Sequence, residues 1–515
     1  MVIRDWSSDV CSSDLVKQGT GTLTLSGANI FSGGVTVNAG RVNAAHVQAL
    51  GVGPVVNNGM IDFTVSPATY SGASYKISGG GTNNVTIQTN LGGSTSYFDG
   101  DYTGFTGVWN IGVGAGTVAG RVRMNARDNP ASVIVVRTNA TLWCNTAIPH
   151  NGTLVLQGGN TGESNGQLRL DNNALWAGPI FLAGVFTDGN DGFFGSGSGT
   201  GFISGQIADA GGAVPVNKVS GNTISIIGTN NTFGGQVWIR AGTLRASAIR
   251  NIGQPSSLGA PANAANGVIK IGNGTTGAQL TYDGMGDTTD RGIELTTTTG
   301  TVTLDHSGKN VWQLTGDVTT TGVGNKTFRL QGSTVGATGV LAGVISDYSA
   351  STTNTLVKSG TGVWALSGAN TFKGNVTVEN GVLVIRNSGA FGPGPKNVQA
   401  ANNQNGANPR IHLDGSAGDL TFPPEITFRT SNQRLGAIIN ESGNNTILGQ
   451  IHLTSGDGDT VLKSESGKLT ATGLVYAPSD TSRQLRLWGD GDGEISGVRS
   501  EEHTSELQSR ITKSY

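Results

Sequence analysis

The sequence predicts an all-β chain folded as a solenoid, and three observations lead to this class. Gly accounts for 83 of the 515 residues, and no stretch shows the sustained 3.6-residue hydrophobic period of a long helix. Short alternating segments such as Val376-Thr377-Val378 lie between glycine-containing turns, a pattern typical of short strands. The same strand-and-turn pattern recurs along the chain. Units this small cannot bury a core alone, so they must stack on one another.

The clearest unit spans 356–385 and reads LVKSGTGVWALSGANTFKGNVTVENGVLVI. Its predicted strands are 363–366, 376–378 and 383–385, and glycines mark the corners between them. Alternation predicts that Val376 and Val378 face the core while Thr377 faces outward.

Further copies are expected near 15–42, 218–244 and, in part, 461–473. The first of these aligns with 356–385 without a gap. Equivalent corner positions hold an asparagine in three copies, and we expect it to tolerate a positive φ: Asn29, Asn231 and Asn370. A phenylalanine follows two residues later in each, and we expect it to pack at the corner: Phe31, Phe233 and Phe372.

The shared phrase LVKxGTGxxxLSGANxFxG-xVTVxxG resembles the passenger-associated transport repeat, also called the autotransporter-associated β-strand repeat. This resemblance implies a right-handed parallel β-helix that forms a single elongated rod. It also implies an exported passenger at the bacterial cell surface, carried through the outer membrane. A C-terminal translocator barrel is then expected in the full-length protein, outside this fragment.

The two ends of the sequence require a separate interpretation. Residues 499–509, RSEEHTSELQS, back-translate to the adapter used in short-read sequencing libraries, and 5–14, DWSSDVCSSD, back-translate to its reverse complement. We therefore expect 1–15 and 499–515 to be adapter-derived and disordered, and we expect the β-helix to occupy 16–498. Such segments are left out of fold reasoning.

Charge and cysteine content exclude several classes of protein. Removing the two tails leaves 32 − 4 = 28 basic and 34 − 6 = 28 acidic residues, so no basic surface for nucleic acid is expected. Cys144 is then the only cysteine, and we expect it to be a small buried apolar residue. No apolar run approaches the length of a membrane span.

The sequence contains no convincing catalytic or metal-binding pattern, so no catalytic, cofactor-binding or metal-binding residue is predicted. The five histidines of 16–498 do not pair at ligand spacing, so we expect each at the surface or at a corner: His46, His150, His306, His412 and His452. Residues 162–166 fit GxSxG and 272–277 fit GxGxxG, but no helical pattern follows either one.

Acidic loops are the one feature left with more than one interpretation. The clusters at 188–191, 457–459 and 490–494 could be solvated corners, or they could offer oxygen ligands to a hard cation such as calcium. Grouped carboxylates also cleave polysaccharides when they share a face. Solvated corners are the preferred reading, and no cofactor is expected.

These observations favour a structural and interaction role, as an adhesin-like passenger or a surface stalk without catalysis. Its partner would be an unknown surface ligand, either a glycan or a protein. The alternative is a carbohydrate-active β-helix, a polysaccharide lyase or hydrolase that uses the clustered carboxylates.

Overall fold

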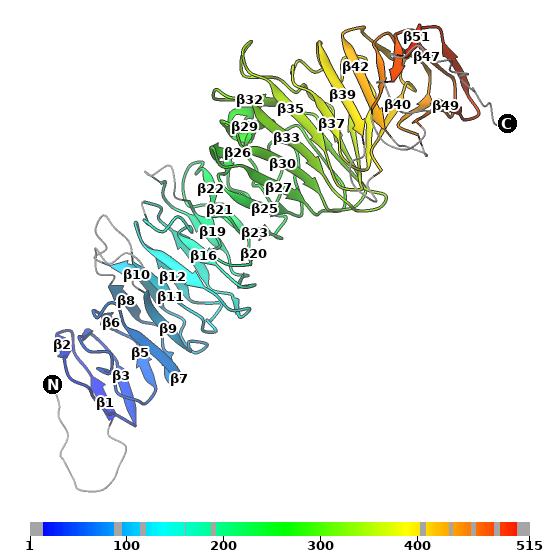
Figure 1. Cartoon of the computed structure of the whole chain (residues 1–515). Helices are drawn as coiled ribbons and strands as arrows, with labels where there is room; N and C mark the ends of the chain where they lie inside the picture. Colours follow the sequence, from blue (N-terminus) through cyan, green and yellow to red (C-terminus); the bar gives the residue numbers. More distant parts are fainter. Residues whose placement is uncertain are drawn as a thin grey trace. The chain divides into compact units, whose positions relative to one another are not determined.

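The computed structural model describes residues 14–86, 95–113, 120–159, 161–186, 192–401, 408–431, 436–454, 460–477 and 485–501. The chain divides into two compact units. The N-terminal unit comprises Met1–Arg245 with Gly253–Gly267, and the C-terminal unit comprises Ala246–Ile252 with Val268–Tyr515. Each unit is a stack of β-coils (Figure 1).

The described strands of the N-terminal unit belong to three sheets, which are called A, B and C within this unit. Sheet A has the hydrogen-bonded order β1 (Asp14–Lys17), β3 (Gly34–Val37), β5 (Val55–Asn57), β7 (Thr69–Ser78), β9 (Thr95–Asp101), β11 (Arg121–Arg123), β13 (Thr141–Cys144), β16 (Leu168–Leu170), β19 (Phe194–Gly195), β22 (Val216–Val219) and β24 (Val237–Ile239). Sheet B has the order β2 (Thr22–Leu25), β4 (Arg41–Ala44), β6 (Met60–Phe63), β8 (Thr82–Thr86), β10 (Val108–Val113), β12 (Val133–Val136), β15 (Thr153–Leu156), β18 (Ile180–Leu182) and β21 (Ile207–Asp209). Sheet C has the order β14 (Pro149–His150), β17 (Leu175–Trp176), β20 (Thr200–Ile203), β23 (Thr223–Ile226) and β25 (Gly242–Ala246), and a single helical turn follows as α1 (Ala264–Gly267).

The described strands of the C-terminal unit belong to four sheets, which are called D to G within this unit. Sheet D has the order β26 (Ile269–Gly274), β29 (Ile293–Thr297) and β32 (Val318–Thr320). Sheet E has the order β27 (Ala278–Tyr282), β30 (Thr301–His306), β33 (Lys326–Gln331), β35 (Asn354–Lys358), β37 (Val376–Val378), β39 (Lys396–Ala401), β42 (Ile426–Ser431), β45 (Ile451–Leu453), β48 (Val475–Ala477) and β51 (Arg499–Glu501). Sheet F has the order β28 (Asp287–Thr289), β31 (Val311–Leu314), β34 (Thr338–Leu341), β36 (Val363–Leu366), β38 (Val382–Ile385), β40 (Arg410–Asp414), β43 (Ile438–Ser442), β46 (Thr460–Ser464) and β49 (Leu485–Trp488), and sheet G has the order β41 (Thr421–Phe422), β44 (Asn444–Ile447), β47 (Lys468–Ala471) and β50 (Asp492–Ile495).

Neighbouring strands run parallel, and each pairs with the strand one coil further along the chain. Leu15 pairs with Val35, a step of 35 − 15 = 20 residues. Val398 pairs with Phe428, a step of 428 − 398 = 30 residues. The strands therefore keep register while the corners between them vary in length. Together these pairings confirm the prediction of an all-β parallel solenoid.

Side-chain alternation places the core inside the coils. In β37 the two valines are buried and Thr377 is partly exposed, as predicted. Large aromatic side chains fill the interior of both units, including the fully buried Trp109, Trp176, Trp312 and Trp364. Burying a large apolar side chain contributes roughly 1.5–3 kcal/mol. Stability is thus distributed along each stack, because every coil contributes its own inward residues.

The segments assigned to adapter sequence are only partly described. Asp14 and Leu15 belong to β1, which pairs with β3, and Arg499–Glu501 form β51, which pairs with β48. The structure thus places these residues in strands rather than in disordered tails. Residues 1–13 and 502–515 lie outside the described residues, and the adapter origin of both tails stays a prediction. Among the described residues, no helix is long and apolar enough to cross a membrane.

Candidate functional site

The lysine of the repeat is a buried link between successive coils. Lys358 is fully buried, and its Nζ donates to the carbonyl oxygens of Ser359 (2.8 Å), Gly360 (2.8 Å) and Asn380 (3.0 Å). Three carbonyls match the three donors of an ammonium group. Asn380 lies one coil further along, so the contact joins two coils.

Two other copies contain the same arrangement, called here the lysine crown. Lys17 Nζ donates to Gln18 (3.0 Å), Gly19 (2.6 Å) and Ala39 (3.3 Å), and Lys218 Nζ donates to Ser220 (2.7 Å), Ala241 (2.7 Å) and Asn222. Burial lowers the pKa of both Lys218 and Lys358 to about 7. In the partial copy at 461–473 the equivalent Lys463 is part-exposed and pairs with Glu465 instead.

The asparagine of the repeat is a hydrogen-bond bridge, and the expectation of a positive φ is wrong. Asn370 Oδ1 accepts from the Ile345 N–H (2.8 Å) and its Nδ2 donates to the Ala390 carbonyl (2.6 Å). These partners lie on the coils before and after Asn370. Within the described part of the chain, the non-glycine residues with positive φ are others: Asn139, Ser164, Asn172, Asn173, Ser220 and Asn310.

Asn231 repeats this bridge within the N-terminal unit, and Asn29 makes its donor half. Asn231 accepts from the Ile207 N–H (2.8 Å) and donates to the Ser257 carbonyl (3.1 Å). Asn29 donates to the Ala49 carbonyl (2.7 Å). The corner phenylalanines pack as predicted in two copies, where Phe233 and Phe372 are fully buried. A glycine of the next coil covers each one; a Cβ on Gly259 would lie 2.3 Å from the Phe233 carbonyl oxygen.

A second polar assembly lies on the outward face of sheet A. Tyr97, Arg123, Trp143 and Arg169 stand in register on β9, β11, β13 and β16. Their strand neighbours Val122, Leu142 and Leu168 are buried, so the four side chains point outward by alternation. We call this row the polar ladder.

Guanidinium groups surround the indole of the ladder. The Arg169 Cζ lies 4.7 Å from the Trp143 ring centroid, and the Cζ atoms of Arg121 and Arg123 lie 5.1 and 5.6 Å from it. Arg123 also lies over the Tyr97 ring at 4.2 Å. Cation–π contacts of this kind contribute about 0.5–1 kcal/mol at exposed sites and more when desolvated.

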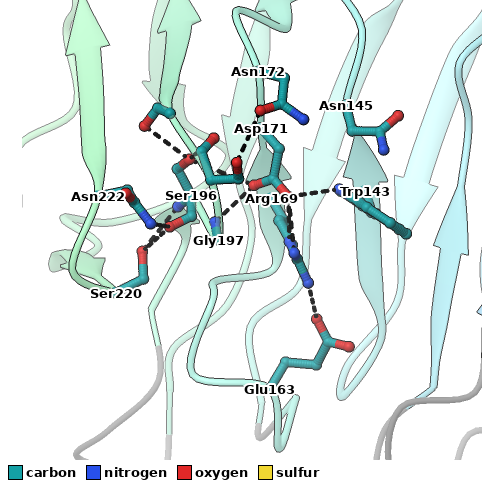
Figure 2. A network of polar contacts seen from close by, with 12 residues as sticks. Trp143, Asn145, Glu163, Arg169, Asp171, Asn172, Ser196, Gly197, Ser220 and Asn222 are labelled. Atoms are coloured by element: carbon teal, nitrogen blue, oxygen red, sulfur yellow. Dashed lines mark hydrogen bonds and ion pairs between the residues drawn. The ribbon is translucent and has the colours of Figure 1, made fainter.

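Asp171 is the hub of this assembly (Figure 2). Its carboxylate accepts from Trp143 Nε1 (3.0 Å), from Arg169 Nε (2.9 Å) and from the Gly197 N–H (2.6 Å). Ser196 Oγ lies 3.4 Å from Asp171 Oδ1, the oxygen that also accepts from the Gly197 N–H. The side chain of Asp171 is 2% exposed, so a charge that would be costly when buried alone is fully hydrogen-bonded.

Two further carboxylates complete the assembly. Asp99 pairs with Arg123 and accepts from the Asn125 N–H at 3.2 Å. Glu163 extends from the turn before β16 and places Oε1 at 2.7 Å from Arg121 Nη1, with Oε2 at 3.6 Å from Arg169 Nη1. Three arginines thus meet three carboxylates, and the assembly is electrically neutral. From here on, the polar ladder means the row together with Arg121 and the carboxylates of Asp99, Glu163 and Asp171.

The histidines do not all lie where the sequence predicted. His150 and His306 are buried in the core, so the prediction of a surface or corner position is wrong for both. The His150 ring stacks on Trp176, with centroids 5.2 Å apart and planes 5° apart, and burial lowers the pKa of His150. His306 Nε2 lies 3.1 Å from the Asn310 carbonyl oxygen and packs near Tyr282 and Trp312.

The remaining histidines are partly exposed and make local contacts. His46 Nδ1 accepts from the Gln48 N–H (3.1 Å), His412 pairs with Glu441 (2.5 Å), and His452 stacks on Tyr476 at 4.3 Å. Among the described residues, no group of three or more His, Cys, Asp or Glu side chains could hold a metal ion.

Neither glycine motif precedes a helix. Residues 162–166 lead into β16, and 272–277 join β26 to β27. The described structure therefore provides neither the nucleophile elbow nor the phosphate-binding helix that these motifs need. Instead, the first motif presents Glu163 to the polar ladder.

The acidic clusters are only partly described. The clusters 188–191 and 457–459 lie outside the described residues. In 490–494, Glu494 pairs with Lys468, and Asp492 to Ile495 form β50.

Cys144 is fully buried as predicted, and burial raises the pKa of its thiol. Trp364 is a core residue, whereas Trp238 is half-buried beneath Arg240, whose Cζ lies 3.6 Å from the ring centroid.

Comparisons with known proteins find one repeat family and a curated relative. Three segments, 15–44, 221–246 and 356–385, match the Passenger-associated-transport-repeat family. The curated "Adhesin BmaC autotransporter" of Brucella suis biovar 1 (strain 1330) is 29% identical to the chain over 433 residues. That similarity covers 75% of this chain but 12% of the relative. No solved structure matches the chain.

The matched repeats lie in coils that have few residues between paired strands. Leu356 pairs with Val376, a step of 20 residues, and the lysine crown and asparagine bridge fall within that segment. The repeat is therefore a unit whose named side chains attach each coil to its neighbours. Its three matched copies, together with the similarity to an autotransporter adhesin over 75% of the chain, make the chain similar to autotransporter passenger repeat proteins.

Proposed function

We propose that this chain is part of the passenger of an autotransporter adhesin, exported to the bacterial cell surface, where it acts by contact and not by catalysis. The observation that carries the proposal is the similarity to an adhesin autotransporter along three quarters of the chain, with the repeat matched in three places. In this role the solenoid holds outward side chains at a distance from the cell.

The chemistry of the described residues supports a role without catalysis. Hydrolysis of a glycosidic bond by paired carboxylates needs one of them to be a proton donor and the other a free base or nucleophile. In the polar ladder Asp99, Glu163 and Asp171 each face a guanidinium group. Each of these three carboxylates is thus already occupied by a cationic partner.

A bead assay tests the proposal directly. The full chain is coupled to beads, which are counted after washing on epithelial monolayers and on extracellular-matrix coatings. The control beads carry a β-solenoid protein of similar size that lacks passenger repeats. We expect the chain to increase bead attachment several-fold over the control. Attachment equal to the control on every surface would sink the proposal.

A second arm tests catalysis. The chain is incubated with a panel of neutral and acidic polysaccharides, and both reducing ends and unsaturated products are measured. We expect no release above a heat-denatured sample. Turnover that disappears in a variant with the acidic groups at 490–494 neutralised would favour a polysaccharide-cleaving enzyme instead.

A further inference from the structure

The three carboxylates of the polar ladder differ in how firmly each is held. Asp171 accepts a backbone N–H from Gly197 and Asp99 accepts one from Asn125. The contacts of the Glu163 carboxylate are to guanidinium groups, Arg121 on one side and Arg169 on the other. Glu163 is therefore the carboxylate that a competing anion could replace with the smallest change to the fold.

The two guanidinium groups are fixed independently of Glu163. Arg169 is held through Nε and Nη2 by Asp171, at 2.9 and 2.8 Å, so its Nη1 is the donor that faces Glu163. Arg121 is held through Nε by Thr95 Oγ1 at 2.5 Å, and its Nη1 faces the same carboxylate. The two Nη1 donors thus converge on one carboxylate position, and they would remain there if Glu163 moved away.

From this geometry we propose that Arg121 and Arg169 form a receptor for the carboxylate of an acidic glycan, with Glu163 as an internal competitor. The proposal rests on the proposed adhesive function and gives it a ligand class. Displacing Glu163 leaves three arginines against two carboxylates, a net charge of +1 that a ligand carboxylate neutralises. Charge-assisted hydrogen bonds to a carboxylate are among the strongest available to a protein surface.

The surrounding side chains favour a glycan over a peptide. Extended peptides commonly bind sheets by adding a strand to an open edge. Here β11 is already paired with β9 and β13, and β13 with β16, so the main chain of this face is occupied. Recognition must come from side chains, and the face offers aromatic rings and amide groups beside the arginines, including Trp143 and Asn145 (Figure 2).

Access to the receptor comes from partial exposure. The side chains of Arg121 and Arg169 are 21% and 13% exposed, and Glu163 is 9% exposed. The turn that carries Glu163 has exposed neighbours at Gly162 and Ser164. Rotation of this one side chain would open the receptor while Asp171 keeps the ladder assembled.

The test measures binding of oligogalacturonate to the full chain by calorimetry, with the fully methyl-esterified oligosaccharide as the matched probe. Esterification removes the carboxylate charge and keeps the sugar backbone. We expect oligogalacturonate to bind and the methyl ester to bind at least about tenfold more weakly, because the ester lacks the carboxylate charge and so loses the charge-assisted contacts with the arginines. Glu163→Gln removes the competitor's charge with little change in size, and we expect it to tighten binding about fivefold.

Variants of the receptor complete the design. Arg121→Gln is expected to weaken binding at least about tenfold, while Arg41→Gln, which removes the partner of Asp62 elsewhere in the same unit, should leave it unchanged. Thermal melting of each variant reports folding, and Arg121→Lys retains the charge if the Gln variant fails to fold. Weaker binding by Glu163→Gln, or equal binding of the ester, overturns the proposal.

Two further outcomes are informative. If poly-glutamate peptide binds with the same dependence on Arg121 and Glu163 while oligogalacturonate does not, the glycan assignment is wrong. If beads bearing the chain attach to cells but no acidic glycan binds, this inference fails and the adhesive function stands. Loss of bead attachment itself would remove the adhesive function as well.

Discussion

The indole nitrogen of Trp143 donates a hydrogen bond to Asp171 at 3.0 Å, across two neighbouring coils and 28 residues of sequence. The same carboxylate oxygen receives Arg169 Nε at 2.9 Å. One buried oxygen therefore fixes both an aromatic ring and a guanidinium group of the polar ladder, which is why the ladder remains ordered on an outward face.

Asp171→Asn is expected to destabilise the N-terminal unit strongly. The change leaves Arg169 with a neutral partner in a site that is nearly closed to water, and breaking a buried pair costs about 3–5 kcal/mol. Chemical denaturation followed by circular dichroism measures the loss. The matched control is Asp62→Asn, whose partner Arg41 is 48% exposed, and for which we expect a cost below about 1 kcal/mol. Equal costs for the two variants would contradict a hub role for Asp171.

Substitution by glycine separates the two interpretations of the repeat asparagine. If Asn370 served to adopt a positive φ, glycine would be neutral or stabilising. Because Asn370 bridges Ile345 and Ala390, we expect Asn370→Gly to cost about 2–4 kcal/mol through two unpaired buried groups.

The control for that substitution is Asn173→Gly. Asn173 is exposed and has a φ of 67°, so glycine should be neutral or slightly stabilising there. Thermal melting of both variants beside the parent chain gives the comparison. A stable Asn370→Gly variant would restore the conformational interpretation.

Lys358→Met is expected to destabilise the C-terminal unit by leaving three carbonyl oxygens without the ammonium, at a cost of roughly 1–3 kcal/mol for each group left unsatisfied. The control is Lys373→Met, whose side chain is exposed and should contribute little. Hydrogen exchange at the amides around Gly360 and Asn380 locates the effect. Protection there should fall in Lys358→Met and remain in the control.

The pKa of Lys358 also predicts a dependence on pH. Burial lowers this pKa from 10.5 to about 7 in the folded chain. Between these two values the unfolded chain keeps a proton that the folded chain has lost, so the free energy of unfolding should rise with pH from about 7 to 10.5. The slope of denaturation midpoints against pH measures this, and it should be smaller in Lys358→Met. Identical slopes would show that Lys358 does not titrate in this window.

Burial of His150 predicts a second pH dependence of stability, this time at acidic pH. Burial lowers its pKa below 6.5, so the unfolded chain binds a proton more readily than the folded one as the pH falls below about 6.5. The N-terminal unit should therefore lose stability on acidification. We expect His150→Phe, which keeps a ring for stacking on Trp176, to reduce that loss. Unfolding at pH 5 and pH 8 gives the measurement, and an unchanged acid sensitivity would contradict the prediction.

The repeat pattern was sufficient to predict the local fold. Glycine corners and side-chain alternation predict strands at 363–366, 376–378 and 383–385; the structure reproduces the first two and begins the third one residue earlier, at Val382. A repeated pattern also requires stacking. Sequence does not determine the role of Asn370, because a corner asparagine is compatible with either a positive φ or a hydrogen-bond bridge. Only the positions of Ile345 and Ala390 on adjacent coils distinguish the two.

The polar ladder was not predicted, and the reason is the variable length of the coils. Arg121 and Glu163 are 42 residues apart and meet across two coils. One of these coils has a step of 20 residues, Arg121 to Thr141, and the next a step of 26, Leu142 to Leu168. Without both lengths, neither the register nor the shared face of these side chains can be obtained from sequence. The one available signal was the density of Arg, Asp and aromatic residues between 97 and 171.

The difference between a 20-residue and a 30-residue coil has a consequence for how such a protein changes over generations. Extra residues enter at a corner and leave the pairing of the flanking strands intact, as Val398 and Phe428 show. Outward side chains that lie outside assemblies such as the polar ladder are not needed to hold the core. Corner loops and face residues can therefore be replaced separately, so that a lineage could exchange what its surface protein touches while inheriting the same scaffold.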